Sequence, residues 1–67
     1  MTTITLNGEV REVPEGSSLE ELVAAIADAP QALATAVNQQ FVPRQQRAAC
    51  VLREGDDVFT FQPITGG

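Results

Sequence analysis

The sequence predicts an α+β fold, in which one helix packs across one face of a mixed sheet of four to five strands. Three observations support this prediction: a hairpin pattern opens the chain, one amphipathic helix follows it, and extended segments fill the second half. The chain has 67 residues, which is enough for one small domain. Because the pattern contains a single helix, the apolar face of the sheet must be covered from one side.

The first segment has the pattern of a β-hairpin. Residues 2–7 alternate polar and apolar side chains, so that Ile4 and Leu6 share one face of a strand. Asn7-Gly8 then favours a type I′ turn, because both central residues of that turn need a positive φ. Residues 10–13 return as the second strand. The hairpin is therefore expected to bury one face.

A helix over about residues 18–28 is predicted by its start, its stripe and its end. Ser17 and Ser18 each precede a glutamate by three residues, which gives two overlapping capping boxes. The apolar positions recur with helical spacing and form one stripe: Leu19, Leu22, Val23 and Ile26. Pro30 disfavours the helical conformation at the residue before it and closes the helix.

The second half reads as further strands joined by short turns. Residues 33–37 form the third strand, 38–40 a turn, and 58–62 the last strand. Between them, residues 44–50 are compatible with one helical turn and residues 51–52 with a short edge strand. A right-handed crossover places either the third or the last strand beside the first. The resulting architecture is a β-grasp, or ubiquitin-like, fold.

Composition excludes several classes of function. Four arginines and no lysine stand against nine acidic residues, and the net charge of −5 argues against nucleic-acid binding and favours a basic partner surface. With no histidine and one cysteine, zinc sites and nucleophile–histidine pairs are not available, so we expect no metal site and no enzyme. No membrane-length apolar run and no signal-peptide pattern are visible, which predicts a cytoplasmic protein that does not bind membranes.

The end of the sequence is its most informative feature. Residues 1–62 form the predicted domain and residues 63–67 a flexible tail that ends in Gly66-Gly67. Two residues without Cβ atoms can enter a narrow channel, and Pro63 has no N–H to continue the sheet. The alternative is a frayed terminus without a chemical role. The tail residues are Pro63, Ile64, Thr65, Gly66 and Gly67.

Several short stretches of the second half are distinctive: Ala36-Val37-Asn38-Gln39-Gln40, Val42-Pro43-Arg44, Glu54-Gly55-Asp56, Phe61-Gln62 and Gly66-Gly67. Together they resemble the ThiS sulfur carriers of thiamine biosynthesis, within the ubiquitin-like ThiS/MoaD family. The resemblance covers essentially the whole chain and is strongest from about residue 34 onward. Arg47 departs from the aromatic residue common in the family, and Cys50 stands where a histidine is expected.

The resemblance implies a cycle of chemistry at Gly67. A ThiF-type, E1-like adenylating enzyme would use ATP to convert the Gly67 carboxylate into an acyl-adenylate. A persulfide derived from cysteine through a desulfurase would displace AMP, and reduction would leave a thiocarboxylate. Thiazole synthase (ThiG) would take this sulfur. The carrier itself would bind no cofactor.

A partner-binding surface is predicted on the sheet face away from the helix. Phe59 and Phe61 lie on one face of the last strand, and they point outward if the helix packs against the other face. The reverse arrangement puts both phenylalanines in the core, and Val42 either extends the surface or lies inside. The resemblance favours the outward arrangement. The predicted partner-binding residues are Phe59, Phe61, Ala34, Ala36 and Val42.

Other interpretations remain open at this point. The same tail chemistry would serve a molybdopterin-type sulfur carrier, whereas a ubiquitin-like protein modifier would join the glycine to lysines of other proteins. A plain interaction module would use the tail for nothing. Cys50 is either a redox thiol or persulfide relay, or a small hydrophobic residue of the core.

Overall fold

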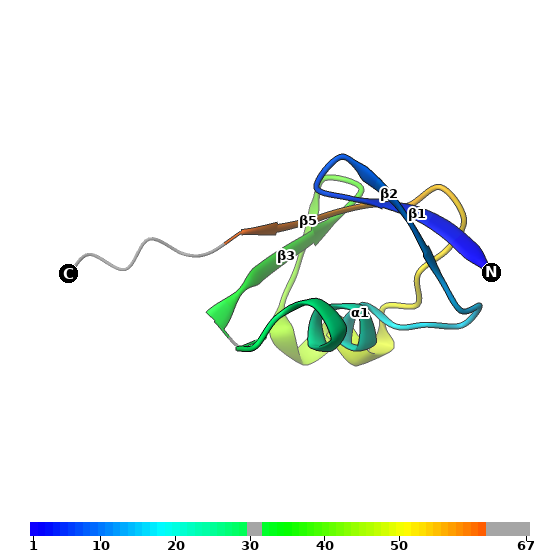
Figure 1. Ribbon diagram of the computed structural model, residues 1–67. Coiled ribbons are helices and arrows are strands. Elements are labelled where there is room, and N and C mark those ends of the chain that lie inside the picture. The colour runs from blue at the N-terminus through cyan, green and yellow to red at the C-terminus, as the bar shows by residue number, and fades with distance from the viewer. Residues whose placement is uncertain (30–31, 62–67) are drawn as a thin grey trace.

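The computed structural model describes residues 1–29 and 32–61. It contains a five-stranded mixed sheet, with a helix and a 3₁₀ helix on one side of it (Figure 1). The elements are β1 (Thr2–Leu6), β2 (Glu9–Val13), α1 (Leu19–Ile26), β3 (Ala34–Val37), β4 (Gln40–Val42), η2 (Arg44–Ala49) and β5 (Asp57–Phe61). This arrangement confirms the predicted α+β, β-grasp architecture.

The strand order is β2-β1-β5-β3-β4, so the last strand lies in the middle of the sheet. β5 runs parallel to β1 and antiparallel to β3. Of the two placements that the crossover rule left open, the last strand is therefore the neighbour of the first. β5 therefore has a ladder partner on each side: β1 pairs with Asp57 and Val58, and β3 pairs with Val58 to Phe61.

Both hairpins turn through asparagine. Asn7 and Gly8 have φ of 52° and 87°, and Asn38 and Gln39 have φ of 52° and 69°, the pattern of type I′ turns. The first turn was predicted. The second was predicted to span residues 38–40, but Gln40 already belongs to β4. A two-residue turn of this type matches the twist of the paired strands, which explains why the shorter turn forms.

α1 begins at the predicted cap and ends earlier than predicted. Ser18 is the N-cap, and its hydroxyl accepts a hydrogen bond from the Glu21 N–H at 3.1 Å, so the second of the two capping boxes is the one used. The helix has eight residues and stops at Ile26, because Ala27 is already extended. Pro30, predicted to close the helix, lies outside the described residues. No helix in residues 1–29 and 32–61 is long and apolar enough to cross a membrane.

The core lies between α1 and one face of the sheet. The predicted helical stripe is buried there, with Ile26 half-buried at its end. The buried apolar residues are Ile4, Val13, Leu19, Leu22, Val23, Leu52 and Val58. Residues 51–52, predicted as an edge strand, form only an isolated bridge in which Val51 pairs with Ser18. Leu52 follows that bridge into the core.

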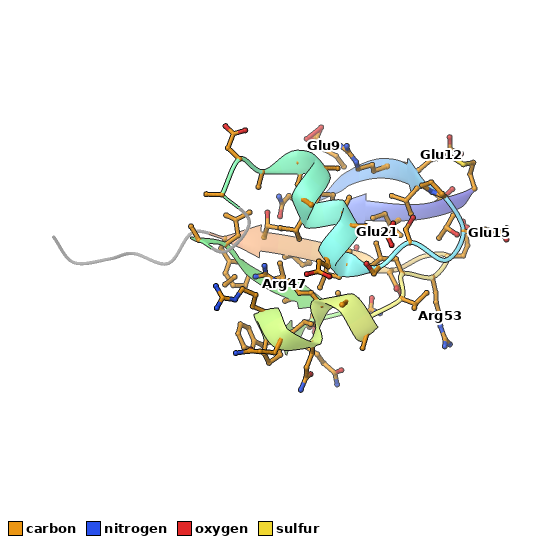
Figure 2. The ribbon with its side chains drawn as sticks, turned by 90° about the horizontal axis from the view of Figure 1, so that it is seen from below. Glu9, Glu12, Glu15, Glu21, Arg47 and Arg53 are labelled. Carbon is orange, nitrogen blue, oxygen red and sulfur yellow. The ribbon has the colours of Figure 1, made fainter. Side chains whose placement is uncertain are left out.

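η2 confirms the helical turn predicted in residues 44–50, and it buries an arginine. Arg47 is only 4% exposed and lies between η2 and the sheet (Figure 2). Its Nε donates to Thr35 Oγ1 at 3.1 Å, and its Nη2 donates to the Leu33 carbonyl. Arg47 thus packs its apolar stem in the interior, and its polar head is hydrogen-bonded.

Candidate functional site

Three phenylalanines lie on the sheet face opposite α1. The strand register places Ala36 between Phe59 and Phe41, and it places Ala34 opposite Phe61. Phe41 is 65% exposed, Phe59 38% and Phe61 48%, whereas Val58 is fully buried on the other face. These side chains form the aromatic patch, defined as Phe41, Phe59, Phe61, Ala34 and Ala36. The arrangement with both C-terminal phenylalanines in the core is therefore wrong.

Val42 does not belong to the aromatic patch. It pairs with the buried Thr35, is half-buried and packs against the core. Its neighbour Phe41, which the sequence prediction did not include, takes the exposed position instead. Alternation along β4 puts Phe41 and Val42 on opposite faces of the sheet. Phe41 was not predicted as exposed because a three-residue turn at 38–40 does not give the register that pairs Phe41 with Ala36.

Two carboxylates at the start of β5, away from Phe61, form hydrogen bonds that stabilise the fold. Asp56 accepts hydrogen bonds from the Asn38 side chain at 3.1 Å and from the Arg53 N–H at 2.9 Å. Asp57 accepts a hydrogen bond from the Thr5 hydroxyl. These contacts fix the turn that leads into β5. The start of β5 is therefore polar, whereas its end carries Phe59 and Phe61.

Cys50 lies at the rim of the core. It is half-buried and packs against the core residues. Burial, and to a smaller extent the negative charge of Asp56, raise the pKa of its thiol. A raised pKa keeps the sulfur protonated at neutral pH and lowers its reactivity. This environment agrees with the prediction of a small core residue better than with that of a sulfur relay.

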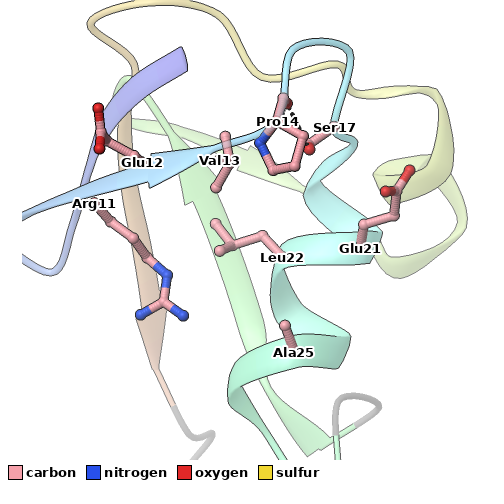
Figure 3. A pocket seen from close by; sticks show the side chains of 8 residues that line it. All are labelled: Arg11, Glu12, Val13, Pro14, Ser17, Glu21, Leu22 and Ala25. Carbon is pink, nitrogen blue, oxygen red and sulfur yellow. Dashed lines mark hydrogen bonds between the residues drawn. The ribbon is translucent and has the colours of Figure 1, made fainter. Parts of the chain in front are cut away.

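A shallow groove lies between β2 and α1, on the helix side of the sheet (Figure 3). Arg11 and Val13 face it from β2, and Glu21 and Leu22 line it from α1. Its lining mixes both signs of charge and therefore matches no single class of ligand. Glu9 and Glu12 are exposed on the neighbouring edge strand β2 (Figure 2). Charged side chains of this kind protect an edge strand against unwanted pairing.

Comparison with known proteins identifies the family of this chain. The model of the ThiS family matches residues 4–67. The chain belongs to the ThiS family. The match begins at Ile4 within β1 and continues through β5 to Gly67, so it includes both the aromatic patch and the residues predicted to form the tail.

Two kinds of relative support the ThiS assignment. The sulfur carrier protein ThiS of Escherichia coli (strain K12) is 34% identical over 64 residues, which covers 96% of this chain and 97% of that protein. The crystal structure of the thiamine biosynthesis protein ThiS from Geobacter metallireducens matches with a TM-score of 0.84 at 26% identity, covering 98% of this chain and all of that one. A solution structure of a thiamine biosynthesis protein from the same organism matches with a TM-score of 0.74 at 26% identity, covering 98% of this chain and 88% of that one.

The predicted tail of this ThiS-family chain lies outside the described residues. This holds for Gln62 and for all five residues named as the tail, Pro63, Ile64, Thr65, Gly66 and Gly67. Phe61 is the last residue described before them, and it belongs to both β5 and the aromatic patch. In the sequence, Gln62 alone separates Phe61 of the aromatic patch from Pro63, the first residue of the predicted tail.

Proposed function

We propose that this ThiS-family protein is the sulfur carrier of thiamine thiazole biosynthesis, and that it carries sulfur as a thiocarboxylate on Gly67. One observation supports this proposal most strongly. Phe59 and Phe61 are exposed on the strand that leads toward Gly66-Gly67, in a chain whose residues 4–67 match the ThiS family. A docking surface and a reactive terminus placed end to end are what a carrier needs if other proteins perform its chemistry.

The proposed chemistry begins with activation, because a carboxylate is a poor electrophile. A ThiF-type adenylating enzyme joins the Gly67 carboxylate to the α-phosphate of ATP, which forms the acyl-adenylate and releases pyrophosphate. The terminal sulfur of a persulfide, supplied through a cysteine desulfurase, then attacks the carbonyl carbon, and AMP leaves. A thiol reduces the resulting acyl disulfide, and the thiocarboxylate remains on Gly67. Thiazole synthase takes the sulfur from it.

The folded domain contributes binding and presentation to this cycle, and it is no enzyme by itself. The aromatic patch supplies apolar side chains of the type that dominate protein interfaces. The net charge of −5 favours a partner surface that is basic around an apolar centre. The partners provide ATP binding, the persulfide and the catalytic groups. We place this cycle in the cytoplasm.

Intact-mass spectrometry tests the proposal. The chain is incubated with ATP, a ThiF-type enzyme, a desulfurase, cysteine and a thiol reductant. A sulfur carrier gains the mass difference of one oxygen-to-sulfur exchange, and this gain disappears when ATP is left out. A protein modifier instead appears as conjugates with other proteins, and an interaction module keeps its mass. Either of these two results contradicts the proposal.

Two tail variants locate the reaction. Deleting Gly67 removes the proposed acceptor carboxylate from its position and should abolish the mass gain. Gly67→Ala keeps a terminal carboxylate but adds a Cβ, and it should slow activation by crowding the enzyme's channel. Thiazole formation that continues with the deletion variant would show that the tail assignment is wrong.

A further inference from the structure

β5 extends past the end of its parallel neighbour. β1 ends at Leu6, which lies opposite Val58, whereas β5 continues to Phe61. On the β3 side, Ala34 still pairs with Phe61. On the β1 side, the chain has already entered the hairpin turn at Asn7. The end of β5 that leads to residues 62–67 therefore needs another partner on that side.

Asn7 supplies that partner through its side chain. Its backbone N–H donates to the Val58 carbonyl at 2.8 Å, as in a continuing parallel ladder. Its own carbonyl would be the next acceptor, but the φ of 52° turns the backbone into the hairpin. The side-chain oxygen replaces it and accepts from the Thr60 N–H at 3.0 Å, while Nδ2 donates to Thr60 Oγ1 at 3.1 Å. The carboxamide thus acts as one more rung of the ladder.

Asn38 makes the equivalent contacts at the other end of β5. It also has a φ of 52°, and its side-chain oxygen accepts from the Asp57 N–H at 3.0 Å. Its Nδ2 donates to Asp56 at 3.1 Å. Both asparagines are exposed, so neither is needed to fill the core. The two differ in place: Asn38 holds the start of β5, and Asn7 holds the end from which the proposed tail continues.

We propose that Asn7 is a positioning residue for adenylation of the carrier: its carboxamide holds Thr60, so that residues 62–67 start from a fixed point beside the aromatic patch when the adenylating enzyme binds. This inference rests on the proposed function. Six residues beyond Phe61 reach about 20 Å when extended, so the position of Phe61 fixes the centre of the region that Gly67 can reach. If Thr60 is not held, the adenylating enzyme must order the end of β5 when it binds, which weakens binding.

Three variants separate this role from a general effect on stability. Asn7→Gly keeps the turn, because glycine adopts positive φ freely, but removes the carboxamide. Asn38→Gly is the matched control, since it removes the same side chain from the same backbone conformation at the far end of β5. Asn7→Asp retains an oxygen that accepts from the Thr60 N–H, and the Thr60 hydroxyl can reverse and donate to it. This conservative variant should restore the positioning.

Two measurements are made on each variant. Amide hydrogen exchange reports whether the strand end is held, and steady-state adenylation separates KM from kcat. We expect Asn7→Gly to speed exchange at Thr60 and to raise the KM of the adenylating enzyme for the carrier about three- to tenfold, the equivalent of one ordinary hydrogen bond. Because the ordering is completed on binding, kcat should stay nearly constant. Asn38→Gly should speed exchange at Asp57 and leave KM unchanged.

The outcomes distinguish this inference from the proposed function. An unchanged KM in Asn7→Gly, or an equal rise in Asn38→Gly, overturns the positioning role while wild-type activation continues. A KM in Asn7→Asp that matches the glycine variant also overturns it. If the wild-type chain is not adenylated at all, the proposed function fails and the inference fails with it.

Discussion

The two faces of the sheet differ in what covers them, although they share every strand. On the inner face, Ile4 and Val58 are at most 1% exposed beneath α1. On the outer face, Phe59 is 38% exposed although it is the next residue after Val58. The alternation of a strand therefore lets β5 support the core with one side and present apolar surface with the other. Stability and partner binding should respond to different residues of the same strand.

The largest effect on stability is expected from the inner face. Leu19 is fully buried where α1 meets the sheet. Leu19→Ala should lower the free energy of unfolding by about 2–5 kcal/mol, because it removes buried methyl groups and leaves a cavity. A domain of this length has only about 3–10 kcal/mol in total, so the variant should be close to unfolded. Urea denaturation followed by circular dichroism measures the change.

Val10→Ala is the matched control on the outer face. Val10 pairs with Thr5 at the β2 edge and is 74% exposed. Its truncation should change the free energy of unfolding by less than about 0.5 kcal/mol. Equal losses in the Val10 and Leu19 variants would contradict the division of the sheet into a stabilising face and an exposed face.

Arg47 is a charged side chain buried on the inner side of the sheet, and its removal should have the next largest effect on stability. Arg47→Ala leaves the Leu33 carbonyl without its guanidinium donor and opens space beneath Thr35. We expect a loss of about 1–3 kcal/mol in the free energy of unfolding. Arg47→Met keeps most of the apolar stem and should lose less, which separates packing from hydrogen bonding. If both variants are as stable as the wild type, the buried guanidinium contributes nothing to the fold.

The sequence predicted the architecture because its strongest signals are local. The Asn7-Gly8 turn, the Ser18 cap and the helical stripe each determine structure within a few residues, and the structure confirms them. The register of β4 depends on the length of the turn before it, and the turn was predicted one residue too long. For this reason Val42 was predicted in the partner-binding surface, where the structure has Phe41.

Contacts between distant segments were not visible in the sequence. Arg47 was noted as a departure from the family, but its partners are Thr35 of β3 and Leu33, the residue just before β3. The contact of Asn7 with Thr60 joins residues 53 positions apart and depends on how far β5 extends past β1. Periodicity assigns a side chain to a face, whereas tertiary packing decides which side chains meet across elements.

Partner binding should be affected most by the outer face. Phe59→Ala and Phe61→Ala should each weaken binding of the adenylating enzyme by about ten- to a hundredfold, as truncation of an aromatic anchor does at other interfaces. Their free energy of unfolding should fall by no more than about 1 kcal/mol, because both side chains are partly exposed already. Calorimetric titration gives the affinity for the adenylating enzyme, and urea denaturation of the same preparations gives the free energy of unfolding.

Phe41→Ala tests how far the binding surface extends across β4, and Val10→Ala again serves as the control. Weaker binding in the Phe41 variant would extend the contact to the edge of the sheet, and unchanged binding would confine it to β5. A loss of several kcal/mol of stability in the Phe59 or Phe61 variants would show instead that these residues belong to the core.

The smallest effect is expected at Cys50, on the boundary of the inner face. Burial, and secondarily the Asp56 charge, raise its thiol pKa above the ordinary value of 9.0. The folded chain therefore holds this proton more tightly than the unfolded chain does. The resulting stabilisation is fully present below the ordinary pKa and is lost as pH rises through the folded value. Cys50→Ser, which has no thiol to titrate, should show a shallower loss of stability as the pH rises through and above the ordinary thiol pKa. Parallel pH profiles for the two chains would mean that water reaches the sulfur and that the inner face is open at this rim.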